Sequence, residues 1–140
     1  MNIYFTDGSC APNPGSGGYA VILGKKPCAL GWDKNSTNIR MEGMALIAAL
    51  KQAGSEACEV RTDSEFWINV ITKWSISWEA NGWTKKNGEI MNLDIVKELC
   101  ELHRSSQAQL IWVKAHYGNE GNELADEWAN KAREQRLSLS

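Results

Sequence analysis

The sequence predicts an α/β fold with a mixed sheet, in the element order β-β-β-α-β-α-β-α, and three observations lead to it. Residues 2–24 contain two strand-like runs around a turn rich in proline and glycine. Residues 41–48 carry apolar side chains at the i, i+3, i+4 and i+7 positions of a helix. Further along, short apolar runs alternate with helical patterns, which is typical of parallel strands joined through helices.

The first three strands are expected to form an antiparallel meander. Strands are predicted at 2–7 and 17–24, because the residues between them, A-P-N-P-G-S-G-G at 11–18, exclude regular structure. A third strand near 28–33 completes the meander. The chain then enters its first long helix.

Thr37 or Asn38 is expected to cap this helix, and Gly54 is expected to end it after about Ala53. A strand at 58–62 follows, and a second helix starts at Ser64. The apolar face of the first helix is Met41, Met44, Ala45 and Ala48. A helix at 94–103 follows with Ile95, Leu99 and Leu102 facing inward, and the last strand is Leu110 to Val113. The final helix, from about 121 to 134, has Leu124, Trp128 and Ala132 on one face.

Composition excludes several classes of protein. The 140 residues suit one domain, and a hydrophobic fraction of 43% with 23% charged residues is typical of an ordered globular chain. The longest apolar run, Met44 to Leu50, is too short to span a bilayer, and no signal peptide is evident. We therefore expect a cytoplasmic protein without a membrane anchor. Its four cysteines form no C-x-x-C pair, which favours reduced thiols.

Four carboxylates stand at the ends of predicted strands or on predicted helices: Asp7, Glu42, Asp63 and Asp126. Ligands in open α/β sheets bind at the carboxyl ends of strands, where Asp63 is expected. Crowded carboxylates repel one another, so a convergent cluster is stable near neutral pH only when some are protonated or a hard cation lies among them. If the fold brings them together, the sequence predicts a divalent metal site, with magnesium as the natural ion.

Ordered motifs identify a family. T-D-G-S at the first strand is followed by N-P-G-x-G-G-Y, T-N-x-R-M-E, T-D-S and finally W-V-K-x-H-x-G-x-x-x-N-E-x-A-D. In this order and spacing the chain resembles ribonuclease H, type 1, which cuts the RNA strand of an RNA–DNA hybrid. The resemblance covers nearly the whole chain. It implies an RNase H-like five-stranded mixed sheet with helices on both faces.

The resemblance also implies a mechanism. Asp7, Glu42, Asp63 and Asp126 would be the catalytic, metal-binding carboxylates, and His116 a mobile catalytic histidine that transfers a proton or assists product release. Two Mg²⁺ ions, or Mn²⁺ as a substitute, would lie about 4 Å apart and activate the water while stabilising the leaving oxygen. Cleavage would be independent of sequence and would leave 5′-phosphate and 3′-hydroxyl ends.

Substrate contacts follow from the same resemblance, motif by motif. The RNA strand would contact Gly8, Ser9, Cys10, Asn13, Asn38 and Glu65, and the DNA strand the aromatic residues Phe66, Trp74 and Trp78. Thr37 and Asn92 match part of a pocket for a DNA phosphate, and Asn122 is counted with the substrate-binding residues. For Cys10 and the tryptophans, simple packing is the alternative.

Three departures from the family pattern bear on affinity. Ile39 stands where an amide is common, and Glu65 places a carboxylate near the substrate. The segment 74–92 corresponds to a basic protrusion, but its lysines are offset by acidic residues. The sequence therefore predicts weaker hybrid binding and a shallower salt dependence than in a strongly basic relative.

The expected assembly is a monomer made of a single catalytic domain over residues 1–140, with no separate hybrid-binding domain. Two rival functions stay open at this point. One is a hybrid-binding module with weak or no catalysis, which the presence of all four carboxylates disfavours. The other is a nuclease or integrase of the same fold that acts on DNA alone, which the T-N-x-R-M-E helix and the tryptophan-rich segment disfavour.

Overall fold

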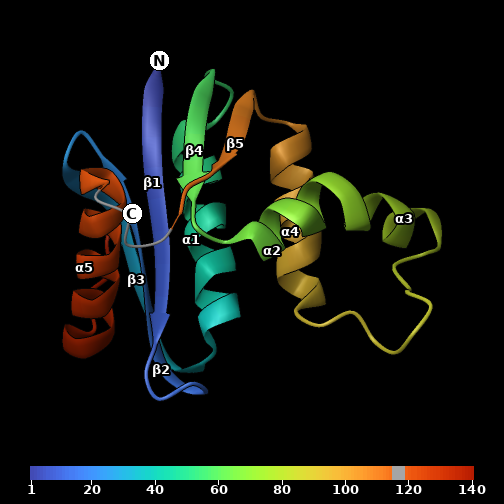
Figure 1. Ribbon diagram of the computed structural model, residues 1–140, viewed down its shortest axis with the longest axis horizontal. Coiled ribbons are helices and arrows are strands. Elements are labelled where there is room, and N and C mark those ends of the chain that lie inside the picture. Colours follow the sequence, from blue (N-terminus) through green and yellow to red (C-terminus); the bar gives the residue numbers. More distant parts are fainter. Residues whose placement is uncertain (115–118) are drawn as a thin grey trace.

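The computed structural model of the protein describes residues 1–114 and 119–140 and contains a five-stranded mixed sheet with strand order β3-β2-β1-β4-β5 (Figure 1). Three antiparallel strands come first in the chain, and two strands parallel to the first complete the sheet. The predicted meander and mixed sheet are confirmed. The strands are β1 (Asn2–Cys10), β2 (Gly15–Leu23), β3 (Lys26–Ser36), β4 (Cys58–Thr62) and β5 (Ala108–Trp112).

Helices cover both faces of the sheet, as expected. In Figure 1, α5 (Glu120–Gln135) lies on one face and α1 (Asn38–Ala53) on the other, with α4 (Leu93–Arg104) packed against α1. A helical arm leaves the sheet after β4 and comprises α2 (Glu65–Asn69), the π-helical segment η1 (Val70–Trp74) and α3 (Ser75–Ala80). The predicted element order names one helix between the last two strands, but the helices predicted from Ser64 and at 94–103 are both present, as this arm and as α4, and residues 81–92 separate them.

The main core lies between the sheet and the helices α1 and α4. Trp67 of α2 is fully buried in it, together with Leu46, Val60 and Leu99. The indole nitrogen of Trp67 donates a hydrogen bond to the carbonyl of Ile39 at 2.7 Å. Because this polar atom is satisfied inside the core, Trp67 fixes α2 against the start of α1.

The first long helix begins as the sequence predicted. Thr37 is its N-cap, and the Thr37 hydroxyl accepts a hydrogen bond from the backbone N–H of Arg40 at 3.1 Å. Gly54 follows the last turn with a positive φ of 59°, and its N–H bonds the carbonyl of Leu50. The inward faces predicted around Ile95 and Leu99 of α4 are also buried.

The buried face predicted for α5 is partly correct. Ala132 is buried as predicted, but it is joined by Ala125 and Ala129, whereas Leu124 and Trp128 are only partly buried. The reason is Gly18 of β2: a Cβ atom on this residue would lie 2.5 Å from the carbonyl oxygen of Ala129. The backbone of α5 therefore packs directly on the sheet, which only small side chains permit.

The C-terminal segment extends the sheet at its outer edge. Leu30 of β3 and Leu139 exchange backbone hydrogen bonds of 2.9 Å in an isolated antiparallel bridge. Over the two described ranges, we find no helix that combines the length and the apolar character needed to cross a membrane.

Candidate active site

Three of the predicted carboxylates meet where β1 and β4 run side by side. Asp7 lies in β1, the central strand, and Asp63 directly follows β4, its parallel neighbour. Glu42 reaches them from the second turn of α1. One carboxylate oxygen from each residue lies within 4.8 Å of the others, which is the spacing of a shared metal site. The parallel pairing predicted from the strand ends is thus what assembles the cluster.

Asp126 approaches the cluster from the opposite face of the sheet. It lies on α5, and its carboxyl group shares a hydrogen bond with that of Asp7. Asp126 is not one of the three residues whose oxygens lie mutually within 4.8 Å. The fold therefore brings the four predicted acids together around Asp7, with Asp126 as the outer member.

Burial and mutual repulsion hold protons in this cluster. Removal from water, together with the smaller effect of the charges of Asp63 and Asp126, raises the pKa of Asp7 to about 9. Burial also raises the pKa of Glu42 to about 7, against the opposing effect of a hydrogen bond from Ser64. Carboxylate oxygens are the ligands that hard divalent cations prefer. The donor set fits such an ion, because its charge would replace the protons that the cluster otherwise retains.

Ser64 is a supporting residue that the sequence reasoning used only as a helix start. Its hydroxyl accepts a hydrogen bond from the backbone N–H of Trp67 at 3.3 Å, which caps α2. The same hydroxyl bonds the carboxylate of Glu42. The T-D-S motif gave a signal for this second contact, since a serine next to a metal-binding aspartate is well placed to orient another ligand.

The raised pKa values predict how the stability of the metal-free protein depends on pH. An unfolded aspartate or glutamate loses its proton near pH 4, whereas Asp7 and Glu42 in the folded protein keep theirs up to about 9 and about 7. Between these values the folded state binds more protons than the unfolded state. The contribution of these groups to the free energy of unfolding is therefore full below about pH 4 and is lost as the pH rises.

Urea unfolding with a chelator at several pH values measures this effect. We expect Asp7→Asn to be more stable than the wild type, with a difference that grows from acidic to mildly alkaline pH, because Asn cannot ionise. A stability difference that is constant over this pH range would contradict the prediction.

The residues predicted to contact RNA surround the end of β1. The backbone N–H of Cys10 donates to Oδ1 of Asn38 at 2.6 Å, and the N–H of Asn38 donates to Oδ1 of Asn13 at 3.2 Å. The Cys10 thiol is buried and bonds backbone carbonyls, so its side chain belongs to the loop packing. Gly8 packs against α1 at Glu42.

The aromatic residues predicted to contact DNA form a continuous row on the helical arm. The ring of Phe66 meets that of Trp74 edge to face at 5.8 Å, and Trp74 lies 6.3 Å from Trp78. Phe66 and Trp74 are 38% and 42% exposed, so the row presents aromatic surface to solvent. Packing alone does not account for the exposure of Phe66 and Trp74, whereas Trp78 is partly buried against the main core. Lys85 and Met91 help to line the adjoining pocket.

The predicted phosphate pocket includes an arginine that was not singled out from the sequence. Nη1 of Arg40 donates to Oδ1 of Asn92 at 3.3 Å, one turn from the cap residue Thr37. Arg40 also pairs with Asp94 at 2.7 Å, and the Arg40 guanidinium lowers the pKa of that carboxyl group. The position of Arg40 in the T-N-x-R-M-E motif, three residues after Thr37, was the sequence feature that could have indicated its place in this pocket.

The remaining predicted residues fall in different surroundings. Glu65 is exposed at the first position of α2, two residues after Asp63. Asn122 is buried in the first turn of α5, where its backbone N–H bonds the side chain of the cap residue Asn119. His116 lies outside the described residues.

Comparisons with known proteins agree with this geometry. The RNase H family model matches residues 1–134. Ribonuclease H of Francisella philomiragia is 45% identical over 136 residues, covering 93% of this chain and 89% of that protein, and ribonuclease H of Francisella tularensis subsp. novicida matches equally well.

Solved structures share the fold at low sequence identity. LC9-RNase H1, described as a type 1 RNase H with the type 2 active-site motif, matches with a TM-score of 0.85 at 23% identity, over 98% of this chain and 74% of that one. The foamy viral protease-reverse transcriptase in complex with dsDNA matches with a TM-score of 0.76 at 20% identity, over 96% and 94% of the two chains. The family model and the sequence relatives cover nearly the whole chain, and the protein therefore belongs to the ribonuclease H family.

Proposed function

We propose that this protein is an endonuclease that hydrolyses the RNA strand of RNA–DNA hybrids in a metal-dependent reaction. The observation that carries the proposal is the convergence of Asp7, Glu42 and Asp63, with Asp126 bonded to Asp7, in a chain of the ribonuclease H family. A binding module would have no use for acids that are buried together, where burial and neighbouring charges raise the pKa values of two of them.

The four carboxylates would hold two Mg²⁺ ions, with Mn²⁺ as the expected substitute. Bound divalent ions lower the pKa of water and neutralise charge on a phosphate, which is the chemistry that phosphodiester hydrolysis requires. Asp7 is central to this arrangement because it is bonded to Asp126 on one side and clustered with Glu42 and Asp63 on the other. The cleavage would leave a 5′-phosphate and a 3′-hydroxyl.

Recognition of the hybrid would be divided between two surfaces. Polar groups and close backbone at Gly8, Ser9, Asn13 and Asn38 would meet the RNA strand, where the 2′-hydroxyl identifies RNA. The row of Phe66, Trp74 and Trp78 would lie against the DNA strand, with Thr37, Arg40 and Asn92 around one of its phosphates. None of these contacts reads a base edge, so cleavage would be independent of sequence.

The decisive experiment compares end-labelled RNA in RNA–DNA and RNA–RNA duplexes, and labelled DNA in a DNA duplex. Each duplex is incubated with Mg²⁺, with Mn²⁺ and with a chelator. We expect cleavage of the hybrid's RNA strand alone, and only with metal. Cleavage of the DNA duplex would favour a DNA-directed nuclease of this fold, and binding of the hybrid without cleavage would favour a binding module.

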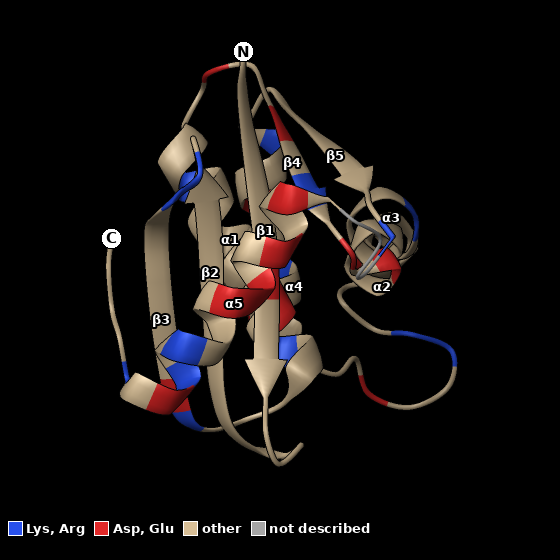
Figure 2. Cartoon of the chain, turned by 60° about the vertical axis from the view of Figure 1, so that its left-hand side comes forward, with Lys and Arg blue, Asp and Glu red and all other residues tan. Residues whose placement is uncertain are grey.

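The salt dependence of hybrid binding should be shallow. The segment after α3 carries Lys85 and Lys86 but also Glu89, and Figure 2 shows basic and acidic stretches in the same loop. Glu79 of α3 forms a salt bridge with Arg104 at 2.6 Å, so the charge of this arginine is partly neutralised. Fewer phosphate contacts release fewer counterions, so log KM should rise with log salt less steeply than in a strongly basic relative. A slope as steep as that of a strongly basic relative would contradict this prediction. The variant Glu89→Gln should show a steeper slope than the wild type.

The monomeric state, the cytoplasmic location and the single catalytic domain over residues 1–140 stay predictions. Sedimentation of the purified protein would test the first. A catalytic role for His116 also stays a prediction, which the dependence of kcat on pH in His116→Ala would test.

A further inference from the structure

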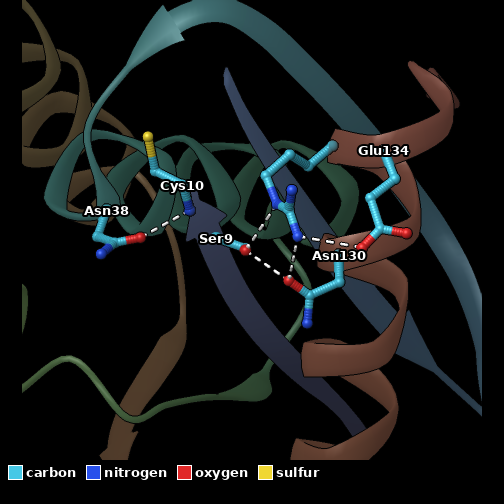
Figure 3. A network of polar contacts seen from close by, with 6 residues as sticks. Ser9, Cys10, Asn38, Asn130 and Glu134 are labelled. Carbon is cyan, nitrogen blue, oxygen red and sulfur yellow. Dashed lines mark hydrogen bonds and ion pairs between the residues drawn. The ribbon is translucent and has the colours of Figure 1, made fainter. Parts of the chain in front are cut away.

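A polar network ties the end of β1 to the second half of α5 (Figure 3). The Ser9 hydroxyl donates to Oδ1 of Asn130 at 2.6 Å, and Nε of Arg133 donates to the Ser9 hydroxyl at 3.3 Å. Nη2 of Arg133 donates to the same Asn130 oxygen at 3.3 Å and pairs with Glu134 at 3.1 Å. Only 18% of the Arg133 side chain is exposed, so the guanidinium is held against the sheet.

This network fixes the direction in which the Asn130 amide faces. A guanidinium group only donates hydrogen bonds, so the atom of Asn130 that meets Arg133 must be its oxygen. The amide nitrogen then lies on the other side, and Figure 3 shows it pointing away from Ser9. Within the described parts of the chain, no hydrogen bond engages this nitrogen, and Asn130 is partly exposed. Two N–H donors therefore remain available at the surface.

These donors lie beside the carboxylate cluster. Ser9 is two residues after Asp7, and residues two apart share one face of a strand. Asn130 is four residues after Asp126, and residues four apart share one face of a helix. The contacts of Asp7 with Asp126 and of Ser9 with Asn130 are thus consecutive contacts between β1 and α5.

We propose that the amide nitrogen of Asn130 donates a hydrogen bond to the backbone of the RNA strand next to the bond that is cleaved. Ser9 and Arg133 are positioning residues that hold the amide oxygen and so aim the nitrogen outward. The inference rests on the proposed function. An RNA backbone offers two kinds of acceptor at this place, the phosphate oxygens and the 2′-hydroxyl. The rival role for the network is merely to fasten α5 to β1, which uses only the oxygen.

Two substitutions at Asn130 separate these roles. Asn130→Ala removes both donors and the acceptor, whereas Asn130→Asp keeps an acceptor for Ser9 and Arg133 and removes both donors. We expect each to raise KM for hybrid cleavage about tenfold, the value of one hydrogen bond to a charged partner, with kcat within about twofold of the wild type. Asn130→Asp should keep the wild-type Tm. The matched control is Gln109→Ala, an exposed amide of β5 at the end of the sheet remote from Asp63, which should leave KM unchanged.

Modified substrates locate the contact. In RNA strands with a single methylphosphonate or a single 2′-deoxy residue, one position should weaken binding to the wild type and have no further effect on Asn130→Ala. The type of modification that shows this loss of effect identifies the acceptor. Arg133→Met should raise KM as well, and the double variant with Asn130→Ala should be no worse than Asn130→Ala alone, because the two residues act as one unit.

Three outcomes would overturn the inference. One is an unchanged KM in both Asn130 variants. Another is that Asn130→Ala lowers Tm and raises KM whereas Asn130→Asp has the Tm and KM of the wild type. The network would then serve only to hold α5 against β1. The third is a wild-type protein that does not cleave hybrids at all, in which case the proposed function fails and this inference fails with it. Hybrid cleavage by the wild type, with either of the first two results, rejects this inference alone.

Discussion

Replacing Asp7 with Asn should abolish most hybrid cleavage while leaving the protein folded. Loss of a residue that only supports a metal ligand lowers metal affinity or activity about 10–100-fold. Loss of a central ligand should lower activity by more than this upper value. Asp7 meets acids that come from helices on both faces of the sheet, since it clusters with Glu42 of α1 and is bonded to Asp126 of α5. Asn has nearly the same shape, so packing around this buried position is kept, and the change removes the ionisable carboxylate that would bind the metal.

Single-turnover cleavage of a labelled hybrid at saturating Mg²⁺ measures the loss. Asp33→Asn is a matched control, because Asp33 is an exposed aspartate of β3 whose carboxylate accepts a hydrogen bond from the backbone N–H of Asn35 and is not part of the cluster of Asp7, Glu42 and Asp63. Its activity should equal that of the wild type. Calorimetric titration with Mg²⁺ should show weakened binding in Asp7→Asn. Full activity of Asp7→Asn with an unchanged metal requirement would mean that the carboxylates serve another purpose.

The positions of these acids could be predicted because they depend on short-range rules. Asp63 ends a parallel strand and Glu42 lies one turn into a capped helix, and both features can be read from a few neighbouring residues. The same holds for the cap at Thr37 and for the glycine that ends α1. The ordered motifs then supplied the pairing of strands that are distant in the sequence.

Other features depend on distances that no local pattern encodes. The buried face of α5 is set by Gly18, more than a hundred residues earlier in the chain, which lets the helix backbone touch the sheet. The contact between Ser9 and Asn130 joins residues 121 positions apart, and neither residue type is unusual at a surface. The π-helical segment η1 is equally hidden, since its sequence, VITKW, has no breaker that distinguishes it from an ordinary helix.

Gly8 shows how such a long-range contact supports the site, and Gly8→Ala should be among the most destabilising single changes in the chain. A Cβ atom at this position would overlap the backbone nitrogen of Glu42 and the carbonyl carbon of Met41. Backbone atoms of a packed helix cannot move aside as a flexible side chain can. Overpacking in cores commonly costs about 1–3 kcal/mol, and a clash with backbone should reach or exceed the upper value.

The same clash should weaken the metal site, because it pushes β1, which carries Asp7, away from α1, which carries Glu42. Urea unfolding of Gly8→Ala with and without Mg²⁺ measures both effects: the midpoint should fall, and the stabilisation that Mg²⁺ gives the wild type should shrink. Gly24→Ala is the control. Gly24 has a positive φ of 62° but open space around it, so its change costs only backbone strain of about 1–2 kcal/mol and leaves the response to Mg²⁺ intact. If Gly8→Ala were no less stable than Gly24→Ala, the close approach of β1 to α1 would not be what holds Asp7 and Glu42 together.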